Sequence, residues 1–86
     1  MEQIKPGIYE HYKGKLYEVI GVAIMSGTED YSDEMKIDNA VVVYRPLYGD
    51  YGLRHRAYRD FCSMVQLPTP TAGYDHVLRF RLIQGF

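Results

Sequence analysis

Hydrophobic and polar residues alternate along most of this chain, and the alternation predicts short β-strands. A period of two residues is typical of a strand with one face against a core. Such stretches, separated by glycine and proline turns, predict five to six strands, over residues 8–13, 16–24, 40–45, 53–58, 62–67 and 78–83. No segment shows a convincing apolar repeat of 3.6 residues, and the sequence leaves open only a short helical turn over residues 33–37. The pattern therefore predicts an all-β protein.

Three of these segments say more about the sheet. Residues 16–24 are mostly apolar on both faces, which predicts a central strand. Gly21 within them predicts a bulge or bend of the kind that closes small barrels. Pro46 is expected to end the strand over 40–45, because proline donates no hydrogen bond to a ladder. In the last strand core positions alternate with outward positions, namely Leu78, Phe80 and Leu82 with Arg79, Arg81 and Ile83.

The chain has 86 residues and a mass of 10.0 kDa, which leaves room for one thin core. We expect a single domain over residues 1–86, built as a small sandwich or, because closure removes exposed strand edges, as a barrel. Aromatic surface is mostly tyrosine, with 9 Tyr, 3 Phe and no Trp. Rings here therefore nearly always carry a hydroxyl group, which suits recognition as well as packing.

The composition indicates the cellular setting. Cys62 is the single cysteine, so the chain cannot form an internal disulfide. No apolar run reaches the length of a membrane span, and residues 1–6 lack the apolar region of a signal peptide. We expect a cytoplasmic protein without a membrane segment.

Charge is unevenly spread although the net charge is only −1. Residues 1–43 hold 8 acidic and 4 basic side chains (net −4), and residues 44–86 hold 3 acidic and 6 basic side chains (net +3). Every basic residue of the second half is arginine, which forms bidentate contacts and stacks on rings. The small net charge argues against a strong, general nucleic-acid binder. The simplest interpretation is that the two halves pair with each other inside the fold.

Three segments together resemble a known family. Residues 7–19 (GIYEHYKGKLYEV), 43–49 (VYRPLYG) and 79–83 (RFRLI) are similar, in this order, to the DUF1653 family of small bacterial proteins of unknown function. The resemblance implies an SH3-like barrel and implies no activity, so function must be argued from a site. The chain departs from the family where Arg54 stands in place of a tryptophan, where Ala57 follows Arg56 in place of a proline, and in a longer acidic segment over 26–39.

The segment over Tyr44–Gly52 is the best candidate site, because it combines tyrosines with glycines that let the backbone turn closely. We predict a non-catalytic binding module whose surface carries rings and guanidinium groups from Tyr12, Tyr44, Arg45, Tyr48, Tyr51, Arg54 and Arg56. Aromatic-lined loops of SH3-like barrels often receive extended proline-rich peptides. The partner would be an unknown peptide or protein. The competing interpretation is that Tyr44 lies in the core and the loop tyrosines cap the barrel end.

Other functions remain open at this point. A small-ligand protein or enzyme would need a titratable pair such as His11 with Glu18, although Glu18 is equally well explained by an ion pair with Arg45 or Arg56. A module for single-stranded nucleic acid would use the arginines beside tyrosines, which are Arg54, Arg56, Arg79 and Arg81.

Metal and cofactor sites have little support in the sequence. His11, His55 and His76 are scattered, and the acidic segment lacks the spacing of a calcium loop. Cys62 stands among apolar residues and is expected to be a buried, inert thiol. We therefore predict no cofactor and no metal, and the oligomeric state stays open.

Overall fold

A computed structural model describes residues 4–86. Residues 1–3 lie outside the described residues. They are the first residues of the predicted domain 1–86 and of the segment 1–6 that was compared above with a signal peptide. The described chain contains seven strands and two short helices, which are β1 (Gly7–His11), β2 (Leu16–Ile24), α1 (Asp33–Asp38), β3 (Ala40–Pro46), β4 (Arg54–Ala57), α2 (Tyr58–Phe61), β5 (Met64–Pro68), β6 (Tyr74–Leu78) and β7 (Phe80–Gly85). The all-β prediction is confirmed. Neither helix is long and apolar enough to cross a lipid bilayer.

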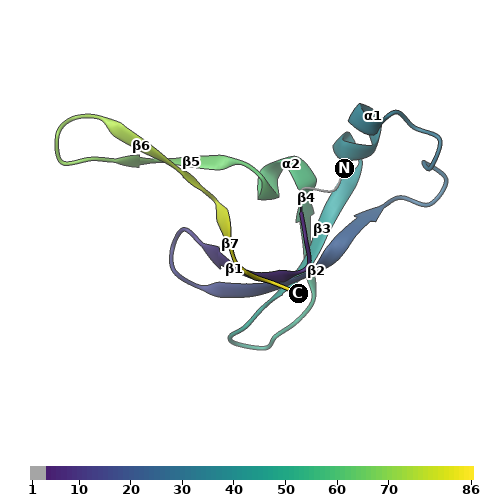
Figure 1. The fold of residues 1–86 in the computed structure, drawn as a ribbon, viewed down its shortest axis with the longest axis horizontal. Helices are drawn as coiled ribbons and strands as arrows, with labels where there is room; N and C mark the ends of the chain where they lie inside the picture. Colours follow the sequence, from purple (N-terminus) through teal and green to yellow (C-terminus); the bar gives the residue numbers. More distant parts are fainter. Residues whose placement is uncertain (1–3) are drawn as a thin grey trace.

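The strands form two antiparallel sheets. Five of them pair in the order β4-β3-β2-β1-β7, and β5 pairs only with β6. Within the described residues β4 and β7 are free edges of an open, curved sheet, so the predicted SH3-like barrel is not confirmed (Figure 1). The β5–β6 hairpin, which we call the arm, projects from one side of this sheet instead of joining it (Figure 1).

Local signals in the sequence explain several of these features. Gly14 has a φ of 100° in the turn between β1 and β2, where a side chain would be strained. The register of β2 against β3 shifts between Val19 and Gly21, which confirms the predicted bulge. β2 is the central strand, and Pro46 is the last residue of β3, both as predicted.

The core lies on one face of the five-stranded sheet, which we call the concave face. Alternate residues of β1, β2, β3 and β7 point there, and α2 covers it (Figure 1). Phe61 of α2 stacks on Phe80 of β7 with ring centroids 4.2 Å apart and planes 4° apart. The buried cluster consists of Tyr9, Val19, Ala40, Val42, Tyr44, Tyr58, Phe61 and Phe80. Five of these eight residues carry rings, which come from four separate elements, so the thin core is held together largely by aromatic contacts.

The acidic segment over 26–39 contains α1, so the helical turn that the sequence left open does form. The Ser32 hydroxyl caps the helix by accepting a hydrogen bond from the Met35 amide, 3.3 Å away. Arg59 of α2 donates a hydrogen bond of 2.6 Å to Asp38 of α1. The acidic first half and the arginine-rich second half therefore pair here, as the charge distribution predicted.

Candidate functional site

Strand register decides which predicted site residues lie on the concave face. Directly opposed residues of an antiparallel pair share a face. Tyr44 opposes both Val19 and Arg54, and Val42 opposes Arg56, so these two arginines lie on the side of the core. His11 opposes Phe80 and lies on the same side. Alternation along β2 adds Tyr17, two residues before the buried Val19.

Tyr17 is at the centre of the partly open aromatic surface. Its ring makes edge contacts with Tyr44, Tyr48 and Phe80 at centroid distances of 5.6, 5.6 and 5.5 Å. The hydroxyl groups of Tyr17 and Tyr48 are hydrogen-bonded at 2.6 Å. Burial, followed by this hydrogen bond, raises the pKa of Tyr17 to about 12. Tyr17 therefore stays neutral at ordinary pH, and its hydrogen bond holds the two rings in position.

Arg56 is held against the same rings. Its Nε donates to the Tyr44 hydroxyl at 3.4 Å, and its Nη1 forms an ion pair with Asp60. The guanidinium carbon lies 5.5 Å from the centroid of Phe80, within cation–π range. The hydrogen bond to Tyr44 is the largest of the effects that raise the pKa of Arg56. This arginine is thus a fixed positive charge at the edge of the aromatic surface.

His11 is a neutral member of this surface. Its ring lies 4.5 Å from Tyr12 and 4.9 Å from Phe80. Burial, with smaller contributions from Arg56 and Lys13, lowers the pKa of His11. The Nδ1 atom accepts a hydrogen bond from the Lys13 amide, which leaves Nε2 as the protonated nitrogen of the neutral ring.

Cations outnumber carboxylates around these rings. The Lys15 ammonium lies 5.2 Å from the centroid of Tyr48, and Lys13 lies 5.8 Å from that of Tyr12. Arg54 forms an exposed ion pair with Asp50 at 3.3 Å. Asp50 and Asp60 are the carboxylates paired to the arginines of this face. The surface is therefore aromatic with a positive rim, which favours a neutral or acidic ligand.

The remaining predicted site residues lie at the margin of this surface or outside it. Tyr51 is exposed in the loop between β3 and β4 and has a φ of 56°. Tyr12 lies at the β1–β2 turn, on the margin of the surface, where its ring contacts His11 and not Tyr48. Arg45 lies on the opposite, convex face and bonds Glu18 through Nε and Nη2 at 2.8 and 2.7 Å. This confirms one of the two partners suggested for Glu18.

Reasoning from the sequence missed Tyr17 and Phe80 as members of this surface. The only clue in the sequence was parity: Tyr17 and the core residue Val19 occupy alternate positions of one strand. Tyr44 is in the core, as the competing interpretation held, yet its hydroxyl reaches Arg56 on the open side. One tyrosine thus serves both packing and the candidate site.

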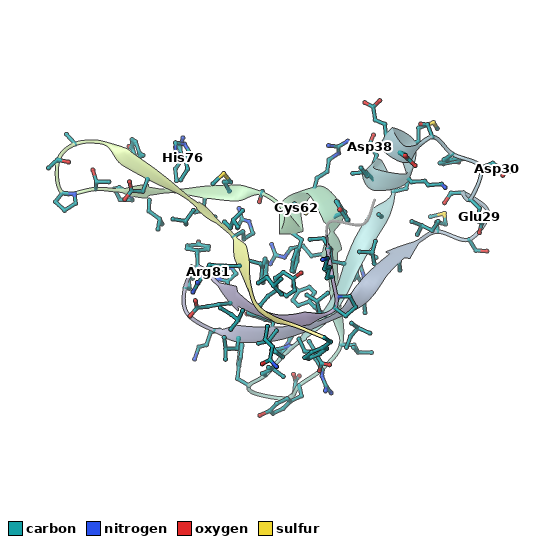
Figure 2. The ribbon with its side chains drawn as sticks, viewed as in Figure 1. Glu29, Asp30, Asp38, Cys62, His76 and Arg81 are labelled. Carbon is teal, nitrogen blue, oxygen red and sulfur yellow. The ribbon has the colours of Figure 1, made fainter. Side chains whose placement is uncertain are left out.

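Three expectations about reactive or paired groups need correction. His11 and Glu18 lie on opposite faces of the sheet, so they do not form a titratable pair. Cys62 is exposed at the end of α2 instead of buried, because the chain turns there toward the arm (Figure 2). Partial burial nevertheless raises the pKa of its thiol, which disfavours the reactive thiolate.

The third correction concerns Arg79 and Arg81, which do not share a strand face. Arg79 lies between β6 and β7 and donates from Nε to the Ser63 hydroxyl at 2.9 Å, whereas Arg81 pairs with Glu10. The predicted strand over 78–83 is therefore two strands of different sheets. Separately, no three potential metal ligands gather within residues 4–86.

Comparison with known proteins identifies the family. A family model described as a protein of unknown function, DUF1653, matches residues 7–82. The chain belongs to this family. It is also similar to a solved structure, a DUF1653 protein from Bordetella bronchiseptica, with 30% sequence identity and a TM-score of 0.67 over 100% of this chain and 95% of that one. No curated protein matches the chain. DUF1653 membership accounts for the fold and leaves the activity to be argued from the concave face.

Proposed function

We propose that this DUF1653 protein is a non-catalytic interaction module that binds an extended, proline-rich segment of a partner protein on its concave face. The Tyr17–Tyr48 pair carries the proposal. Its two rings pack edge to face, their hydroxyl groups are hydrogen-bonded to each other, and Tyr48 is 40% exposed. A rigid pair of half-open rings offers flat apolar surface at little cost in conformational entropy.

Proline suits this surface for a physical reason. A polyproline II segment is already extended, so it loses little freedom on binding, and its rings pack against aromatic side chains. The positive rim adds a preference for acidic residues flanking the prolines. Lys15 lies over Tyr48, and Arg54 projects from the neighbouring edge strand. The unpaired Cys62 supports a reducing compartment such as the bacterial cytoplasm.

The test is a titration of the isotope-labelled protein with a proline-rich decapeptide that carries a glutamate at each end, followed by nuclear magnetic resonance. We expect amide shifts at Tyr17, Tyr48 and Arg56, and none on the convex face. Tyr48→Ala is expected to weaken binding about tenfold, the effect of losing one aromatic anchor. Tyr31→Ala is the matched control, because Tyr31 is exposed to a similar degree in the acidic segment.

Two arginines refine the test. Arg54 and Arg45 each pair with one carboxylate, on the concave and convex faces respectively. Arg54→Gln should weaken binding of the acidic peptide, and Arg45→Gln should leave it unchanged. Shifts confined to the convex face, or none with millimolar peptide, would overturn the proposal. Shifts with a single-stranded oligothymidylate and not with the peptide would overturn it in favour of a nucleic-acid module.

A further inference from the structure

Within residues 4–86, no helix or strand covers one apolar face of the arm. Opposed pairs place Met64 with Leu78, Gln66 with His76 and Pro68 with Tyr74 on one face. Met64, Tyr74 and Leu78 are 54%, 65% and 48% exposed. Figure 2 shows His76 on this side, pointing away from the β1–β2 hairpin. Large apolar side chains clustered on one exposed face are typical of an interaction surface.

The opposite face of the arm turns toward the body of the protein. Leu67 and Val77 are partly buried there. Together with His11, Tyr12 and Arg81 they line a groove of about 330 Å³ between the arm and β1. Leu78, at the base of the arm, also lines this groove, so the exposed face is a second surface that adjoins the groove at that residue.

The arm has little support of its own. It is a two-stranded hairpin whose strands contact mainly each other, and its base is attached to the β1–β2 turn through the hydrogen bond from the Tyr12 amide to the Arg79 carbonyl at 3.0 Å. A two-stranded hairpin is marginally stable in water unless a further strand or surface packs on it. A partner on the exposed face would supply that packing.

The dimensions of the molecule show that the arm stands out from a compact shape. The chain exposes 5949 Å², whereas a compact monomer of its mass exposes about 5,200 Å². Its radius of gyration is 14.5 Å, against about 12 Å for a compact chain of this length. The excess of about 700 Å² belongs to the extended chain as a whole, and it includes the exposed face of the arm.

The charge of the face indicates what the partner is. None of its six residues carries a carboxylate, ammonium or guanidinium group. In a two-fold dimer the same face of each copy contacts that face of the other copy. Two faces of equal charge would therefore repel each other, whereas two uncharged faces do not. We propose that the exposed face of the arm binds the same face of a second copy of this chain.

The experiment is analytical ultracentrifugation of the full chain over a range of concentrations. We expect a dimer that dissociates on dilution. The double variant Met64→Ser with Tyr74→Ser should be monomeric at concentrations where the parent is dimeric. Met25→Ser with Tyr31→Ser is the matched control, because it removes the same two exposed residue types from the connection between β2 and α1 and should leave the dimer intact.

A charge variant gives an independent readout. Gln66→Glu places like charges on the two apposed faces and should weaken the dimer, less so at high salt because the repulsion is screened. Circular dichroism confirms that each variant is folded. A parent that stays monomeric at about 1 mM, far above the dissociation constants of specific complexes, would overturn the proposal. A dimer that both double variants leave intact would equally overturn it, because another surface would then hold the copies together.

Discussion

Phe61 is the side chain whose removal tests the account of the core most directly. It is 1% exposed, stacks on Phe80, and makes edge contacts with Tyr9 and Tyr44 at 5.5 and 5.9 Å. Phe61→Ala removes these contacts and leaves a cavity under α2. Such substitutions cost about 3–5 kcal/mol of unfolding free energy. We expect the upper part of this range, since each lost ring pair contributes about 0.5–1.5 kcal/mol beyond its buried area.

This loss is large for a small domain, whose total stability is typically about 5–15 kcal/mol. Urea unfolding followed by circular dichroism measures it, with Phe86→Ala as the matched control. Phe86 is 73% exposed, so its removal should change the unfolding free energy by less than about 0.5 kcal/mol. A loss of less than about 1 kcal/mol for Phe61→Ala would show that α2 does not anchor the concave face, since surface sites alone give values that small.

Three further predictions follow from local geometry. Gly7→Ala should destabilise the protein by about 1–3 kcal/mol in urea unfolding, because a Cβ there would clash with the Gln84 carbonyl oxygen. Gly21→Ala is the control and should be neutral or stabilising, because the space around a Cβ at that position is open. The raised pKa of Tyr17 means that the folded state favours its protonated form, so the free energy of unfolding should fall as the pH rises from 10 through 12. This fall should be shallower in Tyr17→Phe. Equal falls with pH in the two proteins would contradict the raised pKa of Tyr17. A double-mutant cycle of Glu18→Gln and Arg45→Gln should give a coupling of about 0.5–1 kcal/mol that shrinks in high salt, and a coupling unaffected by salt would contradict an ion pair.

Local signals in the sequence carried much of the fold. Alternation located β2 and β3, Gly21 marked the bulge, and Pro46 ended β3, because each depends on neighbouring residues alone. The pattern failed at β6, where Tyr74, Asp75 and His76 are all exposed and no core face imposes an alternation. It failed again at Arg79, where the chain leaves the arm for the five-stranded sheet. Parity along one strand does not carry across such a change of partner.

The open sheet has a related cause. To close a barrel of this size, the chain after β4 must come back to the sheet and form strands that pair with its edge strands. Here α2 turns the chain away after only four residues of β4, and residues 64–78 pair with each other in the arm. A strand pattern identifies segments that can pair, and it does not identify the partners. The number of short strands therefore could not distinguish a barrel from an open sheet with an arm.

The candidate site shows the same limit at the level of single residues. Arg45 and Arg56 were equal candidates to pair with Glu18, and both stood beside the tyrosines of the predicted surface. Register separates them: Glu18 opposes Arg45 on the convex face, while Arg56 opposes Val42 on the concave face. Because strand side chains alternate with a period of two, a shift of one residue would exchange these roles. The composition of the candidate surface is thus set by pairing between distant segments, and comparing Arg54→Gln with Arg45→Gln tests that assignment of faces directly.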